Sequence, residues 1–306
     1  MRLHALPVAL AAFGTLCVTY AQQPPRTVGI TPIGPLVAIS NPEYSFAEVY
    51  FLSNGGANAL GVVTADGAVL IDAKLPGWGP AVLDALQQVT DMPVTTIINT
   101  HAHEDHAGAD AEYPGPVEIV MHENSSKRLV RGAGTGRTVR TFGDHTTVTV
   151  GKRALQVYHF GRGHTDGDAI VVIPDVKVAY VGDLFAEKAV PVIDPASGGS
   201  ALALPQTLAR AIKEITGVEW VITGHGPPPP GRRRDWRTWN DFREYAEFTR
   251  DFAAAVTAAW KNGRTVEQTV SELTLPDKYK DYSREGAKAT IETIFTELRR
   301  SSAAQR

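Results

Sequence analysis

The segment NTHAHEDHAG, residues 99–108, concentrates side chains that bind metal ions. It holds three histidines, one glutamate and one aspartate in six consecutive positions. Neutral imidazole and carboxylate groups are good ligands for zinc and related ions. On an extended chain the spacing of His101 and His103 puts both imidazoles on one side, whereas Asp105 and His106 come just before a glycine-containing turn. Asp105 and His106 can therefore point elsewhere and serve a second metal ion.

Three further candidate ligands lie where predicted strands end. A catalytic zinc ion takes about three protein ligands and leaves one position open for water, so two ions need more donors than one segment supplies. His164 lies in the glycine-rich turn GRGHTDGD, Asp183 follows the strand AYVG, and His225 follows the strand VIT. Functional residues are often found where a strand gives way to a loop. The sequence thus offers enough donors for a dinuclear centre.

The combined set resembles the metal ligands of the metallo-β-lactamase superfamily. The segment HAHEDH matches the H-x-H-x-D-H motif of that family, and His164, Asp183 and His225 match its three later metal-binding positions in order and context. The resemblance extends from about Tyr44 to Gly226. It implies an α/β fold, the αββα metallo-β-lactamase sandwich, with the metal ions at one edge of the sheets.

The resemblance also implies a role for each residue. A first zinc ion would be bound by His101, His103 and His164. A second would be bound by Asp105, His106 and His225. Asp183 resembles the carboxylate that bridges both ions. Asp72, at the end of VLIDA, resembles a residue that supports the site without binding metal. Zinc is the expected ion, with iron and manganese as alternatives.

Other polar residues near these motifs leave two alternatives each. Asp166 and Asp168 either hydrogen-bond to ligand histidines or cap the turn that holds His164. Lys74, in the segment DAK, either reaches the substrate or lies at a solvent-exposed strand end. The remaining histidines of the mature chain are expected to be ordinary polar residues: His122, His145 and His159. For His159 the alternative is a supporting contact near the metal site.

A dinuclear zinc site indicates hydrolysis. Two zinc ions about 3.5–4 Å apart can share a water molecule and lower its pKa toward neutrality. The resulting metal-bridging hydroxide would be the nucleophile, Asp105 would orient it, and the first zinc ion would stabilise the oxyanion. The expected substrate is a small molecule with an ester, lactone, thioester, amide or lactam bond. Residues 187–204 are expected to form a loop over the metal ions and to influence substrate choice.

Two alternative functions remain. One is a β-lactamase, dedicated or promiscuous. The best-known zinc β-lactamases place cysteine or serine where this chain has Asp183, and many place lysine where it has Ala186. Asp183 is instead similar to the bridging residue of glyoxalase II-like thioesterases, lactonases and phosphodiesterases. The other alternative is a non-catalytic metal-binding protein of the same fold, which the intact ligand set disfavours.

The N-terminal segment predicts a secretory signal peptide, residues 1–21. Arg2 and His4 precede an apolar stretch too short to span a bilayer comfortably, and small residues surround a cleavage position near Ala21. We therefore expect a periplasmic or secreted protein with no stable membrane insertion after cleavage. Cys17 is the one cysteine, so cleavage leaves no disulfide. The net charge of −3 gives no case for binding nucleic acid, and no pattern indicates an oligomeric state.

The order of apolar runs and turns predicts the domain organisation. Residues 22–45 are an extended lead-in rich in proline and glycine. Residues 46–230 form the metallo-β-lactamase domain, with two groups of strands and helices expected at 79–89, 123–131 and 204–216. Residues 231–306, after a proline-rich break, form a C-terminal helical extension packed on the same domain. Its helices are expected at 235–262, 265–273 and 283–300, the first with an aromatic stripe.

Overall fold

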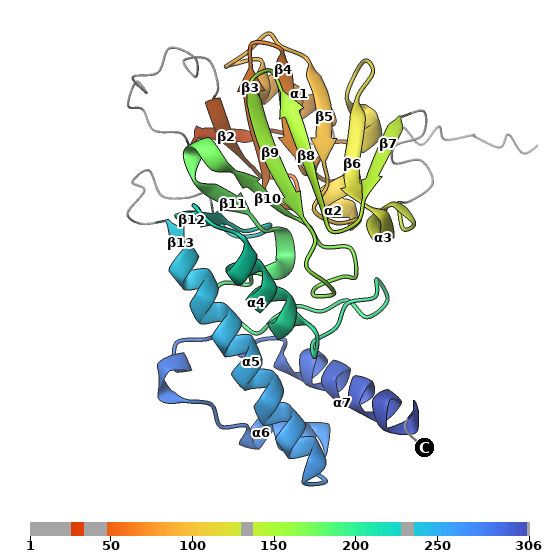
Figure 1. Ribbon diagram of the computed structural model, residues 1–306, viewed down its shortest axis with the longest axis vertical. Coiled ribbons are helices and arrows are strands. Elements are labelled where there is room, and N and C mark those ends of the chain that lie inside the picture. The colour runs from red at the N-terminus through yellow and green to blue at the C-terminus, as the bar shows by residue number, and fades with distance from the viewer. Residues whose placement is uncertain (1–25, 34–47, 130–136, 228–235, 305–306) are drawn as a thin grey trace, which may run out of the picture.

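Two β-sheets packed face to face form the centre of the molecule, and helices cover their outer faces (Figure 1). The computed structural model describes residues 26–33, 48–129, 137–227 and 236–304. The predicted signal peptide and residues 22–25 and 34–45 of the predicted lead-in lie outside the described residues. The arrangement is the predicted αββα sandwich, and helices follow it at the C-terminal end.

The first sheet has seven strands in the order β1-β2-β3-β4-β5-β6-β7. Their bounds are Gly29–Pro32, Glu48–Ser53, Ala59–Thr64, Gly67–Ile71, Val94–Ile98, Glu118–His122 and Thr138–Phe142. Strands β1 to β4 pair antiparallel, whereas β4, β5, β6 and β7 pair parallel. Because parallel strands end at the same edge of a sheet, the residues that follow β4 and β5 become neighbours.

The second sheet has six strands in the order β13-β12-β11-β10-β9-β8. From β8 to β13 their bounds are His145–Val150, Arg153–Tyr158, Ile170–Ile173, Val178–Tyr180, Trp220–Ile222 and Arg237–Thr238. Only β11 and β12 pair parallel; the other pairs are antiparallel. The residues after β11 and after β12 therefore also meet at one edge.

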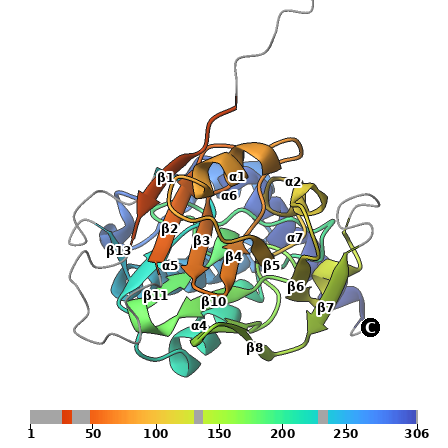
Figure 2. The same ribbon diagram turned by 90° about the horizontal axis from the view of Figure 1, so that it is seen from above.

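Alternating side chains on the strands build the layers. On β4, Val69 and Ile71 point into the core between the sheets. Ala68 and Leu70 point to the opposite face, where helix α1 (Gly79–Leu86) packs with its buried residues. This period of two is the pattern of a strand buried on both faces. Figure 2 shows the layers from above, with α1 on the side of the first sheet and α4 (Leu204–Glu214) on the side of the second.

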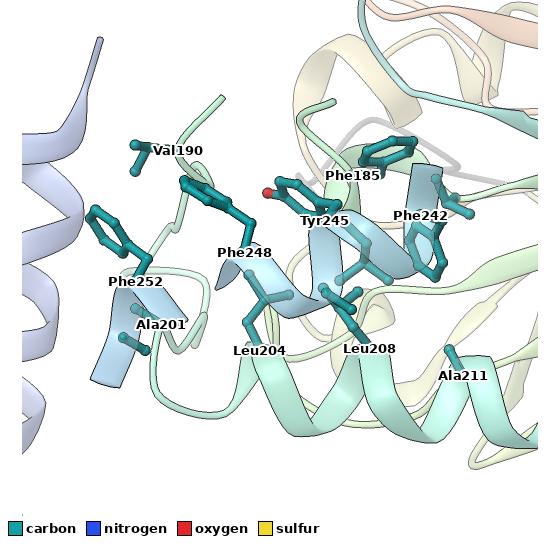
Figure 3. Packing of buried hydrophobic residues seen from close by; sticks show 14 of the residues in the cluster. Phe185, Val190, Ala201, Leu204, Leu208, Ala211, Phe242, Tyr245, Phe248 and Phe252 are labelled. Carbon is teal, nitrogen blue, oxygen red and sulfur yellow. The ribbon is translucent and has the colours of Figure 1, made fainter. Parts of the chain in front are cut away.

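The C-terminal helices share a hydrophobic core with the second sheet. They are α5 (Trp239–Lys261), α6 (Val266–Glu272) and α7 (Ala287–Ala304). The predicted aromatic stripe is buried: Phe242, Tyr245, Phe248 and Phe252 of α5 pack against α4 and against residues of strands β10 to β12 (Figure 3). Thr238 and Asp241 form a capping box that starts α5, because each side chain satisfies a backbone N–H of the other.

Some predicted elements differ from the structure. The lead-in was expected to be extended, and within it residues 29–32 form a strand that was not predicted, β1, which pairs with β2. Of the helix predicted over 123–131, the described residues 123–129 contain the single turn α3 (Glu123–Ser126), and residues 130–131 lie outside the described part of the chain. Trp236, assigned to the aromatic stripe, precedes α5 and lies in the core between the sheets. Within the described residues, no helix combines the length and apolarity needed to cross a bilayer.

Candidate metal centre

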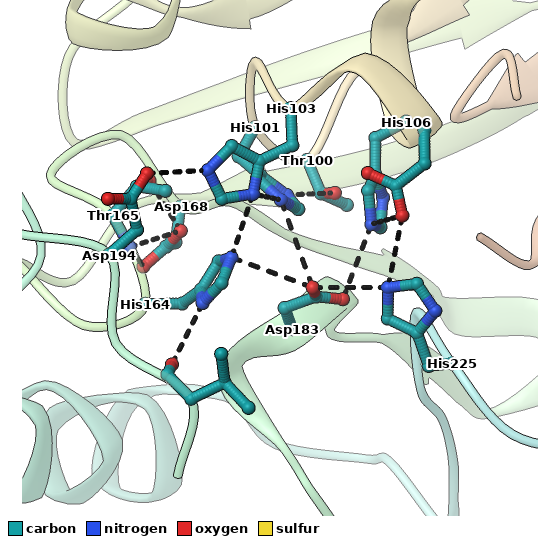
Figure 4. Close-up of polar contacts among 12 residues, drawn as sticks. Thr100, His101, His103, His106, His164, Thr165, Asp168, Asp183, Asp194 and His225 are labelled. Atoms are coloured by element: carbon teal, nitrogen blue, oxygen red, sulfur yellow. Dashed lines mark hydrogen bonds and ion pairs between the residues drawn. The ribbon is translucent and has the colours of Figure 1, made fainter. Parts of the chain in front are cut away.

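The seven predicted ligands converge at one edge of the sandwich (Figure 4). The segment after β5 carries His101 and His103 and continues into the helical turn α2 (Glu104–Ala107), which carries Asp105 and His106. The other three follow strand ends: His164 lies between β9 and β10, Asp183 follows β11, and His225 follows β12. The parallel pairing of β11 with β12 brings the last two together.

The first ligand group consists of His101, His103, His164 and Asp183, whose donor atoms all lie within 4.8 Å of one another. The Nδ1 atom of His103 lies 3.0 Å from Nε2 of His101 and 3.0 Å from Nε2 of His164. Oδ2 of Asp183 lies 3.5 Å from Nε2 of His164. Three imidazole nitrogens thus face a common point beside a carboxylate.

The second ligand group consists of Asp105, His106 and His225, whose donor atoms also lie within 4.8 Å of one another. Nε2 of His225 lies 3.2 Å from Oδ2 of Asp105. Asp183 joins the two groups, because its oxygens lie 3.3 Å from Nε2 of His106 and 3.3 Å from Nε2 of His225. The predicted bridging residue therefore lies between the two sets.

Two buried atoms in this cluster have no hydrogen-bond partner among the described residues. They are Nε2 of His106 and Oδ1 of Asp183, which face each other at 3.3 Å without hydrogen-bond geometry. A buried polar atom without a partner costs about 1–3 kcal/mol. Metal ions coordinated by both groups would satisfy these atoms, so the residues present fit a metal centre.

The charges of the cluster support the same conclusion. Burial alone would raise the pKa of Asp183, but His106, His225 and His101 hold it well below its usual value. Hydrogen bonds that His225 donates to the carboxylates of Asp105 and Asp183 raise the pKa of His225 to about 9. The carboxylates therefore attract positive charge to this point. Metal ions that bind here would displace the histidine protons, as metal binding to imidazole generally does.

Asp72 holds His106 from behind the second ligand group. Its carboxylate lies 2.7 Å from Nδ1 of His106 and accepts the Thr100 backbone N–H at 2.7 Å. The parallel pairing of β4 with β5 produces this contact, since Asp72 follows β4 and Thr100 follows β5. With Nδ1 bonded to Asp72, the Nε2 atom of His106 is directed toward the site. Asp72 thus has the supporting position that the sequence predicted.

Two outer partners of the first ligand group are contacts that sequence reasoning missed. Oδ2 of Asp194 lies 2.9 Å from Nε2 of His103, and the Val192 carbonyl lies 2.8 Å from Nδ1 of His164. Hydrogen bonds from Ser197 and His103 lower the Asp194 pKa to about 2, although burial opposes them. The available signal was an aspartate inside the loop expected over the metal ions, but its partner depends on the path of that loop.

Asp166 and Asp168 hold the turn around His164 and make no direct hydrogen bond to a ligand histidine in the described structure. Asp168 accepts hydrogen bonds from the backbone N–H and the hydroxyl of Thr165. Asp166 forms an ion pair with Arg128. Turn capping is therefore supported for Asp168, whereas the Asp166 carboxylate pairs with Arg128; the expected hydrogen bond to a ligand histidine is wrong for both.

Lys74 neither reaches a substrate nor lies in solvent, so both expectations for it are wrong. Its side chain is 0% exposed, and Nζ donates to the Leu52 and Ala57 carbonyls, each at 2.6 Å. Asp72 and Lys74 both have positive φ, 62° and 78°, and this unusual backbone turns the lysine inward. The ammonium ties the loop between β2 and β3 to the end of β4.

The buried Lys74 predicts a pH dependence of stability. Burial lowers its pKa from 10.5 to about 7, partly opposed by Asp72. Between those values the unfolded chain binds a proton that the folded chain does not, so the free energy of unfolding rises with pH by up to about 5 kcal/mol. Urea unfolding of wild type and Lys74→Met at pH 7, 8 and 9 measures this, with the exposed Lys261→Met as control. Equal pH slopes in wild type and Lys74→Met would contradict the prediction.

A cavity of about 390 Å³ opens beside Asp183 and His225. Its other described lining residues are Phe185, Ala186, Glu187, Val192 and Gly226. Most of these side chains are apolar, and the Val192 side chain is 64% exposed although it is a large apolar group. The cavity is therefore a candidate binding place for an apolar group next to the candidate metal centre.

The chain belongs to the metallo-β-lactamase superfamily, whose sequence model matches residues 53–247. Over 184 residues it is 30% identical to the human metallo-beta-lactamase domain-containing protein 1, covering 57% of this chain and 64% of that protein. Over 175 residues it is 27% identical to metallo-beta-lactamase type 2 of Elizabethkingia meningoseptica, covering 55% of this chain and 68% of that protein. The chain thus spans about two thirds of each relative.

A solved structure matches a larger share of this chain than the two sequence relatives do. The sec-alkylsulfatase Pisa1 from Pseudomonas sp. superposes with a TM-score of 0.67 over 81% of this chain and 48% of that chain, at 15% sequence identity. At this identity the likeness concerns the fold alone. Family membership and the clustered histidine and aspartate residues together support a metallo-hydrolase in general terms.

Proposed function

We propose that this protein is an exported dinuclear zinc hydrolase that cleaves an ester, lactone, thioester, amide or lactam bond of a small molecule. The observation that carries the proposal is the convergence of two ligand groups on Asp183, together with two buried atoms, Nε2 of His106 and Oδ1 of Asp183, that have no hydrogen-bond partner among the described residues. A mononuclear site would leave the second group without a function. Five histidines and two aspartates form a donor set that suits zinc, with iron and manganese as alternatives.

The geometry suggests a separate role for each residue of the candidate metal centre. His101, His103 and His164 would hold one ion, Asp105, His106 and His225 the other, and Asp183 both. When bound, the ions would supply a Lewis acid and a water of lowered pKa. Burial opposes ionisation of Asp105, but His225 and His106 lower its pKa. Asp105 is therefore a carboxylate at neutral pH and would accept a hydrogen bond from the attacking water.

The test combines metal analysis with a substrate panel on one sample. Protein purified without chelator should contain about two zinc ions per chain. It should hydrolyse at least one member of a panel of thioesters, lactones, esters and a chromogenic cephalosporin. Removal of metal with a chelator should abolish that hydrolysis, and added zinc should restore it. A preparation with less than one bound zinc, iron or manganese ion per chain would sink the proposal.

The cavity narrows the expected substrate. Among its described lining residues the charged acidic groups are Asp183 and Glu187, and neither lysine nor arginine is present. An uncharged apolar group attached to the scissile carbonyl fits this lining better than a carboxylate does, because beyond the proposed metal centre the described lining has no lysine or arginine to pair with an anion. We therefore expect neutral acyl substrates with an apolar part to be preferred over substrates that carry a carboxylate.

Val192 provides a test of that preference. Val192→Ser keeps the backbone carbonyl that faces His164 and removes apolar surface from the cavity. Loss of about two methyl-sized groups costs about 1.4 kcal/mol or more, so KM for the best apolar substrate should rise about tenfold with little change in kcat. Val270→Ser, at a valine of α6 that is 38% exposed, is the matched control. An unchanged KM would show that Val192 does not contact the substrate.

A β-lactamase is the second candidate, because metallo-beta-lactamase type 2 of E. meningoseptica is among the relatives. Ala186 and the lining without lysine or arginine weigh against a dedicated β-lactamase, since β-lactams carry a carboxylate. The chromogenic cephalosporin in the panel separates the two candidates. If it is hydrolysed with the highest kcat/KM of the panel, the β-lactamase assignment replaces ours.

Export is the remaining part of the proposal. It is supported by the N-terminal sequence, with cleavage expected near Ala21 and a periplasmic or secreted product without stable membrane insertion. The expected partner is a small-molecule substrate and not nucleic acid. N-terminal sequencing of protein recovered from the periplasm or medium should begin at about residue 22. Recovery of intact chain from the cytoplasm alone would contradict this part.

A further inference from the structure

Residues 190–201, here called the outer segment, contact two histidines of the first ligand group, His103 and His164. The Val192 carbonyl lies 2.8 Å from Nδ1 of His164, and Asp194 lies 2.9 Å from Nε2 of His103 (Figure 4). Each contact leaves the other ring nitrogen of its histidine directed into the ligand group. The path of the outer segment therefore decides how two of the three imidazoles are oriented.

The outer segment has no helix or strand of its own, so other contacts must hold its path. Part of the support is local: the Asp194 N–H donates to the His164 carbonyl at 2.9 Å, and the Gly199 N–H donates to the Asp194 carbonyl at 2.8 Å. A side chain at Gly199 would place Cβ 2.2 Å from the His164 carbonyl oxygen. The segment thus packs directly on the turn that carries His164.

Helix α7 holds the outer segment at both ends. Near its start, the buried Thr290 hydroxyl donates to the Pro191 carbonyl at 2.8 Å. Near its end, the Glu297 carboxylate accepts the Ser200 hydroxyl at 2.5 Å and the Ala201 N–H at 2.9 Å. Residues seven apart lie on one face of a helix, two turns from each other, so a single rigid face of α7 makes all three contacts.

The core fixes α7 in turn. Ile291 and Ile294 are 0% exposed and Phe295 is 3% exposed, all within the core shared with α4 and α5. A continuous set of contacts therefore runs from this core through Thr290 and Glu297 to the outer segment, and from there to His103 and His164. The helix lies beyond residue 247, where the match to the family ends.

We propose that α7 positions the first ligand group for metal binding, with Thr290 and Glu297 as positioning residues that act through the outer segment. The inference rests on the proposed metal centre. Loss of these contacts would free the segment to shift, and the two imidazoles would then have to be ordered at the moment of metal binding. Partners of metal-binding histidines typically contribute 10–100-fold to metal affinity. We expect a smaller effect in the same direction from residues one contact further away.

The test measures zinc binding by competition with a chromophoric chelator, without any assay of activity. Thr290→Val and Glu297→Gln should each lower the zinc affinity of one of the two sites by about three- to tenfold. Asp194→Asn should lower the affinity of the same site by about 10–100-fold. Matched controls lie on the same helix: Thr293→Val removes a hydroxyl that bonds to Ala289 of α7 itself, and Glu292→Gln removes an exposed carboxylate. Both controls should bind zinc as wild type does.

A double variant separates positioning from general destabilisation. If Glu297 acts through the outer segment, Asp194→Asn combined with Glu297→Gln should weaken zinc binding by less than the product of the single effects. The inference would be overturned if the zinc affinities of Thr290→Val and Glu297→Gln lay within twofold of those of their controls. It would also be overturned if the effects on zinc affinity in the double variant were fully multiplicative. Wild-type protein that binds no zinc would instead overturn the proposed metal centre, so the two failures are distinguishable.

Discussion

Asp183→Ala should lose about half of the bound metal and reduce kcat/KM on the order of 10³-fold. Asp183 lies between the two sets of histidines, at 3.5 Å from His164, 3.3 Å from His106 and 3.3 Å from His225. Without it two cations would approach each other with no shared anion between them. Stabilisation of charge by a metal ion in a reaction of this class is worth several kcal/mol, and each 1.36 kcal/mol corresponds to about tenfold in rate.

Metal analysis and kinetics on the same preparation measure this effect. Asp183→Asn keeps the shape of the side chain and removes its charge, so a similar loss in both variants would assign the effect to the carboxylate. Asp84→Ala, at an exposed position of α1, is the matched control and should behave as wild type. An Asp183→Ala protein with two bound ions and full activity would contradict the bridging role.

Asp72→Asn should lower stability by about 3–5 kcal/mol, because it removes the charge of a buried pair with His106. Asp72 is 0% exposed, and its two oxygens also accept the Thr100 N–H and hydroxyl. Asparagine tolerates the positive φ of 62° at this position, so backbone strain does not explain the expected loss. Zinc affinity of the second ligand group should fall about 10–100-fold, since His106 loses the partner that orients it.

Urea unfolding of metal-free protein and zinc competition measure the two effects separately. Asp91→Asn, at an exposed position before β5, controls for the change of charge. The prediction requires both losses together. Wild-type zinc affinity in a destabilised Asp72→Asn protein would show that Asp72 supports the fold without orienting His106.

The family and the ligand set could be predicted from sequence because both depend on local patterns. Apolar runs indicate the strands, and the order of strands and turns predicted two packed sheets flanked by helices. Each ligand directly follows a strand or lies in a tight turn, so its place along the chain indicates its place at the sheet edge. The alternation of His101 and His103 before the turn at Asp105 is of the same kind.

The outer partners could not be predicted, because they depend on the path of loops. Asp194 meets His103 across a separation of 91 positions, through a segment with no regular structure. Lys74 illustrates the same limit. Its charge suggested a position in solvent or a contact with substrate, but the positive φ angles of Asp72 and of Lys74 itself turn its side chain into the interior. Strand β1 was not predicted either, because it depends on pairing with β2 at the edge of the first sheet and not on a pattern in its own residues.

By itself the sequence determined the chemistry of NTHAHEDHAG and of His164, Asp183 and His225: donors of the right type, placed at strand ends, in a family pattern. Tertiary structure decided how those donors share charge and what holds them. Parallel pairing of β4 with β5 brings Asp72 to His106, and parallel pairing of β11 with β12 brings Asp183 to His225. Residue types are local properties of the chain, whereas the orientation of an imidazole depends on a hydrogen-bond partner that only folding brings within 3 Å.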